Sequence, residues 1–285
     1  MKKNQILALT GAAAMSIALL AGCGSNNSSN DNNSSAAGET PSSLSGTVAT
    51  GGSTSMQKLM GMLQEDFMAK NQGVNITYDP TGSGAGITGA EDGSLDIGLS
   101  SRALHDDETD VESITVCLDG IAIVVNNANP VEDLSLQQLA DIYTGKITNW
   151  SEVGGNDGEI VVIGREAGSG TRDGFESIVD VKDNCKYAQE LTATGAVTAA
   201  VASNENAIGY ASLSAVDDSV KSVKVDGVEC SEATVQDGSY KVQRPFNFIV
   251  KKDAQLSDAA QAFVDYVTSG EANEWITKAG CVTIA

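Results

Sequence analysis

The sequence at positions 160–179 reads IVVIGREAGSGTRDGFESIV. Its first four residues are apolar and β-branched, which predicts a buried strand. A turn rich in glycine and serine follows at 164–171, and the pattern from Asp173 onward is typical of a helix. Glycines let the backbone come close to a ligand, and the first N–H groups of a helix have no partner inside it. Because the helix dipole adds positive potential there, the stretch predicts an anion-binding site.

Two arginines, Arg165 and Arg172, flank this turn. The whole chain contains four arginines, so two within eight residues indicate that this turn has a purpose. A guanidinium group makes strong, charge-assisted hydrogen bonds to oxyanions. Arg165 is therefore predicted to contact an anion, whereas Arg172, one turn inside the helix, is predicted to form a structural salt bridge.

The N-terminus has the pattern of a secretory signal. Lys2 and Lys3 give a basic start, residues 6–20 are mostly apolar, and small residues precede Cys23. The apolar stretch is too short and too rich in alanine and glycine for a membrane span. Its Leu-Ala-Gly-Cys ending resembles the bacterial lipoprotein signal, which implies that residues 1–22 are removed and that Cys23 is lipidated. The alternative is an ordinary secreted protein with an incidental cysteine.

A polar segment separates this signal from the rest of the chain. After Cys23, residues 24–43 consist largely of Ser, Asn, Asp and Gly, with almost no large apolar side chain. Such a composition cannot bury enough surface to fold, so residues 23–43 are predicted to be a lipidated, disordered tether. The remaining chain, 44–285, has about 240 residues, enough for one large or two medium domains.

The chain is strongly acidic, with a formal net charge of −21. Loss of Lys2 and Lys3 with the signal leaves 15 basic against 38 acidic residues, a charge of −23. Such a field excludes binding to nucleic acid or to an anionic membrane through overall charge. An anion would have to be bound by local groups against a repulsion that salt weakens.

Four further cysteines follow Cys23, with no Cys-x-x-Cys pair among them, so a zinc site is not expected. An exported protein can keep disulfides. The four residues permit three pairings, and buried free thiols are an equal alternative. The four are Cys117, Cys185, Cys230 and Cys281.

Strand-like apolar runs alternate with helical patterns along the chain. The predicted strands lie at 74–78, 95–99, 114–125, 160–163, 207–211 and 246–250, and the predicted helical segments at 56–67, 136–143, 197–202 and 258–278. This alternation is typical of an α/β fold with mainly parallel sheets.

Three turns share the same chemistry, at 52–55, 82–84 and 168–171. Each follows a strand, opens a helix, and supplies hydroxyls and free N–H groups. A single Ser or Thr at a helix start is common and stabilises the helix by about 1 kcal/mol. Three such turns together with Arg165 instead predict a site for a tetrahedral oxyanion, which has many acceptor lone pairs.

Enzyme motifs are missing from the sequence. The glycines at 82–86 lack dinucleotide-binding spacing, and 164–171 lacks the lysine of a phosphate-binding P-loop. The single histidine, His105, stands among acidic residues and is predicted to be a solvated surface residue rather than a catalytic base. With no metal cluster or activated nucleophile, the chain is predicted not to be an enzyme and to need no cofactor or metal.

Six segments then carry a family resemblance, in one order along the chain. They are GSTS at 52–55, TGSGAGI at 81–87, DIGLSSR at 96–102, IYTGKITNW at 142–150, REAGSGTR at 165–172 and NAIGY at 206–210. Together they resemble the phosphate-binding lipoproteins that feed ATP-driven phosphate importers, in the form of Gram-positive-type sequences. The resemblance covers nearly all of the folded chain.

The resemblance implies a two-lobed periplasmic-binding-protein fold of type II. Each lobe would be a mainly parallel sheet flanked by helices, with phosphate in the cleft between them. Residues 44–125 and 244–285 would form the first lobe and residues 126–243 the second. By the same resemblance, the phosphate ligands are Thr54, Ser55, Ser83, Arg165, Ser169, Gly170 and Thr171.

One position departs from well-known relatives. They place an aspartate after the Asp-x-Gly strand, and its carboxylate accepts the proton of hydrogen phosphate and so rejects sulfate. Here Ser101 and Arg102 stand at that place, and either is a candidate ligand. Arg102 has the alternative of a structural ion pair with Glu166 or Asp96.

The expected function is that of an extracytoplasmic phosphate receptor. It would be a monomer, tethered by lipid to the outer face of the cytoplasmic membrane, and would deliver phosphate to the permease subunits of an ABC importer. One alternative is a receptor for sulfate, molybdate or tungstate. Another is a surface sensor or adhesin with a degenerate pocket.

Overall fold

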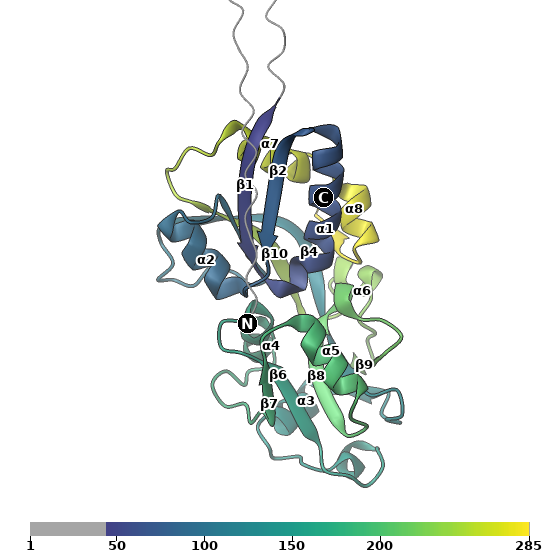
Figure 1. Cartoon of the computed structure of the whole chain (residues 1–285). Helices are drawn as coiled ribbons and strands as arrows, with labels where there is room; N and C mark the ends of the chain where they lie inside the picture. The colour runs from purple at the N-terminus through teal and green to yellow at the C-terminus, as the bar shows by residue number, and fades with distance from the viewer. Residues whose placement is uncertain (1–43, 285) are drawn as a thin grey trace, which may run out of the picture. The chain divides into compact units, whose positions relative to one another are not determined.

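Strand β4 (Val111–Val125) runs through both halves of the structure (Figure 1). The structure is a computed structural model that describes residues 44–284, so the predicted signal, Cys23 and the tether lie outside the described residues. The first part of β4 pairs with one set of strands and residues 121–125 pair with another. This one strand therefore connects the two lobes.

The described residues contain eleven strands. They are β1 (Ser45–Gly52), β2 (Gly73–Asp79), β3 (Ile97–Ser100), β4 (Val111–Val125), β5 (Asp133–Leu134), β6 (Val161–Arg165), β7 (Gln189–Leu191), β8 (Ala207–Ser212), β9 (Lys221–Val225), β10 (Gln243–Lys251) and β11 (Val282–Thr283). The main path through the sheet is β2-β1-β3-β10-β4-β8-β6-β7. The predicted strands are therefore present, with bounds that shift by a few residues.

Helices flank these strands in both lobes (Figure 1). They are α1 (Gln57–Lys70), α2 (Ser83–Asp92), α3 (Leu136–Tyr143), α4 (Gly170–Ile178), α5 (Thr194–Ala202), α6 (Glu232–Gln236), α7 (Asp258–Thr268) and α8 (Asn273–Lys278), with short 3-10 helices η1 (Thr54–Met56), η2 (Trp150–Val153) and η3 (Leu213–Ala215). Helix α4 begins three residues earlier than its sequence pattern predicts, because Ser169 caps it and glycine occupies its first position.

Both lobes contain parallel and antiparallel strand pairs. Strand β1 is parallel to β2 and β3, and β6 is parallel to β7 and β8. Every antiparallel pair between the named strands involves β4, which connects the lobes, or β10, which pairs with β3 and with residues 111–120 of β4. The α/β prediction is confirmed, and the expectation of mainly parallel sheets applies to the strands that precede the three hydroxyl-rich turns.

Two large apolar cores lie on either side of this junction. The first contains side chains of α1, β1, β10 and α7, and we call the part around it the first lobe. The second contains residues 121–125 of β4 with side chains of α3, β6, α5 and β8, and we call the part around it the second lobe. Residues 121–125 are fully buried, which explains their unbroken apolar run, since both faces of the strand are covered.

All four cysteines of the described residues are free thiols, which matches the second alternative left by the sequence. Burial raises the pKa of the Cys117 thiol on β4 well above its usual value. Burial likewise raises the pKa of Cys185 to about 11. The thiols of Cys117 and Cys185 are therefore protonated and unreactive at neutral pH.

Two further observations concern the part of the chain that the structure describes. No helix within residues 44–284 has both the length and the apolarity needed to cross a bilayer. In the same residues, His, Cys, Asp and Glu side chains do not gather in a group of three that would suit a metal ion.

Candidate anion-binding site

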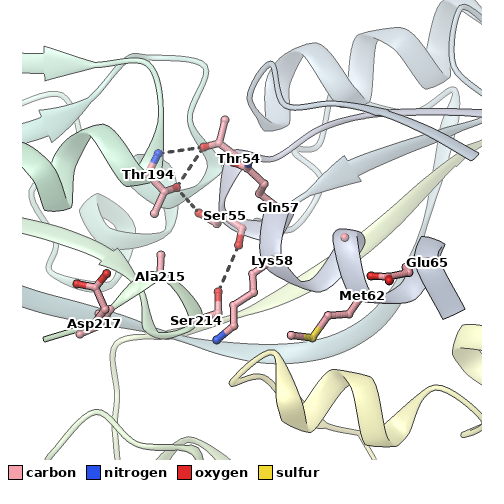
Figure 2. A pocket seen from close by; sticks show the side chains of 13 residues that line it. Thr54, Ser55, Gln57, Lys58, Met62, Glu65, Thr194, Ser214, Ala215 and Asp217 are labelled. Carbon is pink, nitrogen blue, oxygen red and sulfur yellow. Dashed lines mark hydrogen bonds between the residues drawn. The ribbon is translucent and has the colours of Figure 1, made fainter. Parts of the chain in front are cut away.

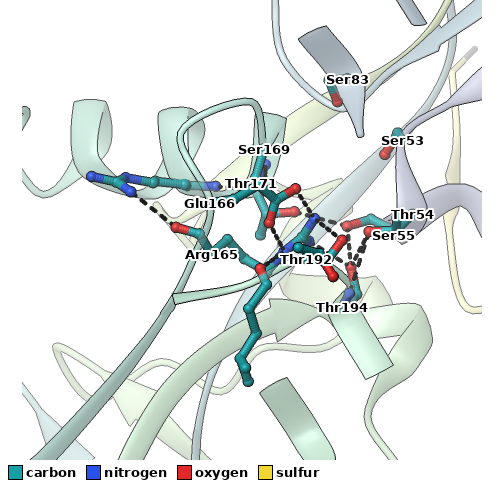
Figure 3. A network of polar contacts seen from close by, with 12 residues as sticks. Ser53, Thr54, Ser55, Ser83, Arg165, Glu166, Ser169, Thr171, Thr192 and Thr194 are labelled. Carbon is teal, nitrogen blue, oxygen red and sulfur yellow. Dashed lines mark hydrogen bonds and ion pairs between the residues drawn. The ribbon is translucent and has the colours of Figure 1, made fainter. Parts of the chain in front are cut away.

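Hydroxyl groups from both lobes meet at the junction (Figure 3). Ser55 Oγ lies 2.8 Å from Thr171 Oγ1 and 2.9 Å from Thr194 Oγ1, and Thr54 Oγ1 lies 3.1 Å from Thr194 Oγ1. Thr54 and Ser55 come from η1 in the first lobe, whereas the other two come from α4 and α5 in the second. All four side chains are buried. The fold thus brings together three predicted ligands with Thr194, which the sequence prediction did not include.

The start of α2 supplies a second pair of hydroxyls. Ser83 Oγ lies 3.1 Å from Ser101 Oγ and accepts a hydrogen bond of 3.0 Å from the Ser101 amide. Both serines are buried. Ser101 and Arg102 stand where well-known relatives have an aspartate. Of these two residues, Ser101 is the one that bonds to the predicted ligand Ser83.

Helix α4 directs its N-terminus at these serines. A Cβ atom at Gly170 would collide with Ser83 Oγ and would lie 2.8 Å from Ser101 Oγ. The Gly84 amide also donates a 3.0 Å hydrogen bond to the Gly168 carbonyl. The starts of α2 and α4 therefore approach so closely that only glycine fits between them, and their N–H groups share one small volume.

Ser169 caps α4 from inside the same volume. Its Oγ accepts hydrogen bonds from the amides of Thr171 and Arg172, at 3.2 and 3.3 Å. Because the oxygen accepts both bonds, the hydroxyl proton is left to donate to an anion. Capping of the helix and anion binding are therefore compatible roles for this residue.

Arg165 is buried behind the hydroxyl cluster, at 1% exposure. Its Nη1 donates to Thr194 Oγ1 at 3.1 Å. Its Nε and Nη2 donate to the Glu166 carboxylate at 2.9 and 2.8 Å, and also to the carbonyls of Leu191 and Thr192. The guanidinium therefore reaches the hydroxyl cluster through Thr194, while Glu166 balances its charge. Glu166 is a further residue that the sequence prediction did not assign to the site.

Arg102 is held away from the cluster by an ion pair. Its Nη1 and Nη2 donate to both Glu108 carboxylate oxygens, at 2.7 and 2.6 Å. Burial works to raise the pKa of Glu108, but bonds from Arg102 and from the His105 amide together lower it below its usual value. This arrangement favours the ion-pair alternative for Arg102, with Glu108 as the partner in place of Glu166 or Asp96.

Arg172 has the structural surroundings that its place in the sequence predicts. Its Nε donates to Glu176 at 2.7 Å and its Nη1 to Glu190 at 3.0 Å. The same Nη1 donates to the Arg165 carbonyl at 3.0 Å, which ties the strand before the turn to the helix after it. His105, predicted to be solvated, is 43% exposed and lies 3.3 Å from Asp173.

A second buried ion pair lies at the junction. Arg244 at the start of β10 donates to Asp119 on β4 at 3.0 and 3.2 Å, and its Nη1 donates to the Ser101 carbonyl at 3.3 Å. Asp119 also accepts a 2.7 Å bond from Ser212. Burial raises the pKa of Asp119 although Arg244 acts against it, and burial lowers the pKa of Arg244. No motif flanks either residue. The available signal was weak: Asp119 is the one charged residue of the apolar run 114–125, and Arg244 lies just before the predicted strand 246–250.

A cavity of about 690 Å³ opens beside the hydroxyl cluster (Figure 2). Thr54, Ser55 and Thr194 form part of its wall. Lys58 on α1 and Asp217 after η3 line other parts. The cavity therefore lies against Thr54 and Ser55, on the side where η1 faces α5.

Comparison with known proteins places this geometry in a family. A family model described as the PBP superfamily domain matches residues 37–271. The chain is 34% identical over 278 residues to the phosphate-binding protein PstS of Bacillus subtilis, covering 94% of this chain and 90% of that protein. This chain belongs to the PstS family of the PBP superfamily. It is also 28% identical to PstS of Staphylococcus aureus strain RF122, over 94% of this chain and 84% of that protein.

Solved structures agree with this membership. A phosphate ABC transporter substrate-binding protein with bound phosphate, from Clostridium perfringens, has 42% identity and a TM-score of 0.79, covering 84% of this chain and all of that one. An ABC-type phosphate transport receptor from Vibrio cholerae has 32% identity and a TM-score of 0.70, covering 83% of this chain and all of that one. The two-lobed fold predicted from the sequence is confirmed, and the PstS family is one of extracytoplasmic substrate-binding proteins for ABC transport, not of enzymes.

Proposed function

We propose that this PstS-family chain captures inorganic phosphate outside the cytoplasmic membrane and delivers it to the permease subunits of an ABC importer. The observation that carries the proposal is the convergence of both lobes on one polar volume, where Ser55 Oγ lies 2.8 Å from Thr171 Oγ1. The names of the similar proteins from B. subtilis and C. perfringens support phosphate as the ligand.

The donors at the junction suit a tetrahedral oxyanion. The proposed ligands contribute hydroxyl groups, the N–H groups at the starts of α2 and α4, and the Arg165 guanidinium. Phosphate offers four oxygens with several lone pairs each, so donors arriving from several directions can all be used. The proposed ligands are Thr54, Ser55, Ser83, Ser101, Arg165, Ser169, Gly170 and Thr171; Arg102, also a candidate from the sequence, is less favoured because of its bonds to Glu108.

Charge is balanced around this site. Each of the four arginines, all in the described part of the chain, forms an ion pair with at least one carboxylate. The anion would therefore be bound largely by hydroxyl and amide dipoles, which are worth more in a buried site than in water. This mode of binding suits a protein with a net charge of −21, because it does not depend on a positive overall field.

Capture proceeds by closure of the lobes in this proposal. The first lobe, predicted from the sequence as residues 44–125 and 244–285, offers Thr54, Ser55 and Ser83. The second, predicted as residues 126–243, adds Arg165 and the start of α4. Because only the closed form applies both sets of donors to the anion, phosphate favours closure through its extra contacts.

The N-terminal pattern supports a lipid anchor on Cys23. The tether of residues 23–43 would hold the folded part, as a monomer, at the outer face of the cytoplasmic membrane. A lipid on a single cysteine keeps the receptor near the permease, which raises its effective concentration there.

Calorimetric titration of the purified chain with phosphate, sulfate and molybdate tests the proposal. We expect saturable binding of phosphate at one site per chain, and no displacement by a hundred-fold excess of sulfate. Displacement by sulfate or molybdate at comparable concentration would identify a receptor for a different oxyanion. Lack of binding to all three would favour a surface protein with a degenerate pocket.

A further inference from the structure

Ser53 has a buried hydroxyl without a partner at the edge of the proposed phosphate site. It lies between β1 and η1, directly before the predicted ligands Thr54 and Ser55, and is 2% exposed. Among residues 44–284, no group forms a hydrogen bond with Ser53 Oγ. By contrast, the hydroxyls of Thr54, Ser55, Ser83 and Ser101 all have hydrogen-bond partners.

The backbone around Ser53 is held rigidly. Its amide donates to the Leu99 carbonyl at 2.8 Å, and its carbonyl accepts bonds from Tyr78 Oη at 2.6 Å and from the Met56 amide at 3.2 Å. The preceding residue, Gly52, has φ +128°, and a Cβ there would collide with the Leu99 carbonyl. The direction of the Ser53 Cα–Cβ bond is therefore fixed, and the side chain is left only its χ1 rotation.

An unpartnered buried hydroxyl lowers stability. Leaving a buried donor or acceptor unsatisfied costs about 1–3 kcal/mol, and an alanine at the same place would avoid that cost. In Figure 3 the Ser53 hydroxyl is directed into the polar volume that Ser83 and Thr171 border. A ligand oxygen in that volume would give the hydroxyl its missing partner.

We propose that the Ser53 hydroxyl is an additional ligand of the bound phosphate. The inference rests on the proposed function, because it assumes an oxyanion between α2 and α4. Residues 53–55 would then contribute three consecutive hydroxyls from one rigid turn. A serine hydroxyl can donate to a phosphate oxygen or accept the proton of hydrogen phosphate, so it suits either face of the ligand.

Substitution Ser53→Ala has opposite effects on binding and on stability if this is correct. Loss of a hydrogen bond to a charged acceptor should raise the Kd for phosphate about ten-fold in calorimetric titration. The melting temperature of the protein without phosphate should stay the same or rise, because an unsatisfied group is removed. Ser53→Thr, which retains a hydroxyl, should keep the Kd within about three-fold of the wild type.

Ser222→Ala is the matched control. Ser222 Oγ on β9 is also buried without a hydrogen-bond partner among the described residues, but β9 contributes no residue to the proposed site. Its substitution should leave the Kd for phosphate unchanged. A ten-fold weaker Kd in Ser53→Ala but not in Ser222→Ala supports Ser53 as a ligand.

Two results would overturn the inference. One is a wild-type Kd in Ser53→Ala; the other is a lower melting temperature or a failure to fold, since either of these would mean that the hydroxyl has a structural partner. Absence of phosphate binding by the wild type would instead overturn the proposed function on which the inference rests.

Discussion

Two buried arginine–carboxylate pairs lie at the junction of the lobes, and they differ in burial and in sequence separation. Arg165 pairs with its sequence neighbour Glu166, whose side chain is 27% exposed. Arg244 pairs with Asp119, which lies 125 positions away and has no exposure. Arg165 also reaches a hydroxyl of the proposed phosphate site through Thr194, whereas Arg244 reaches only the carbonyl of Ser101 there.

The difference indicates separate roles for the two pairs. Glu166 can turn toward water when an anion arrives, so Arg165 can exchange part of its bonding for a ligand. Asp119 cannot reach water, and a buried charge that loses its partner is strongly destabilising. We therefore infer that the Arg165 pair serves binding in the proposed site, whereas the Arg244 pair joins β10 to β4 beside it.

Asp119→Ala should have the largest effect, and it acts on stability. The substitution leaves the Arg244 guanidinium uncompensated and removes the acceptor of Ser212. We expect the free energy of unfolding to fall by about 3–5 kcal/mol in urea titrations. Phosphate affinity of the protein that remains folded should change by less than about five-fold. A stability loss below about 1 kcal/mol would contradict the role given to this pair.

Arg165→Ala should act chiefly on binding. It removes the guanidinium from the hydroxyl cluster, so we expect the Kd for phosphate to rise by about 100-fold or more, a loss of about 3 kcal/mol. Unfolding in urea should show a smaller loss than Asp119→Ala, because Glu166 can be solvated. Unchanged phosphate affinity would show that phosphate does not bind at this pocket.

Gly170→Ala tests the close approach between the starts of α2 and α4. Its Cβ would collide with Ser83 Oγ and push the start of α4 away from α2. We expect about ten-fold weaker phosphate binding, together with a loss of about 1 kcal/mol or more in the free energy of unfolding, because the added methyl group overpacks the contact. Gly195→Ala at the start of α5 is the control, because a Cβ there meets no atom within 4 Å. Equal affinities in both variants would mean that the N-terminus of α4 does not bind the anion.

The Arg102–Glu108 ion pair is a third arginine–carboxylate pair, and we expect its loss to have a smaller effect on stability. The pKa of Glu108 is lowered in the folded protein, so the pair stabilises the fold above the usual glutamate pKa, near 4.5. That stability is lost as the pH falls through the lowered value. Glu108→Gln should cost about 1 kcal/mol at pH 7 and much less at pH 3, measured by urea unfolding at both pH values. An equal loss of unfolding free energy at both pH values would show that the charge of Glu108 does not contribute to stability.

The parts of the candidate site that consist of consecutive residues could be predicted from the sequence. The turns at 52–55, 82–84 and 168–171 each carry a local pattern, and the structure brings all three together. Tertiary pairings have no such local pattern. Asp119 and Arg244 meet because β4 and β10 pair in an antiparallel register, which the alternation of strands and helices does not reveal. Thr194 was missed because the helical pattern becomes clear only after α5 has begun.

A crystal structure of the chain with phosphate is the most direct test of the central claim, that one anion is bound by donors from both lobes at this junction. We expect phosphate oxygens within hydrogen-bond distance of Thr54 or Ser55, of Ser83, of Arg165 and of the amides at the start of α4. Phosphate bound elsewhere, or contacted by one lobe alone in the closed protein, would contradict it.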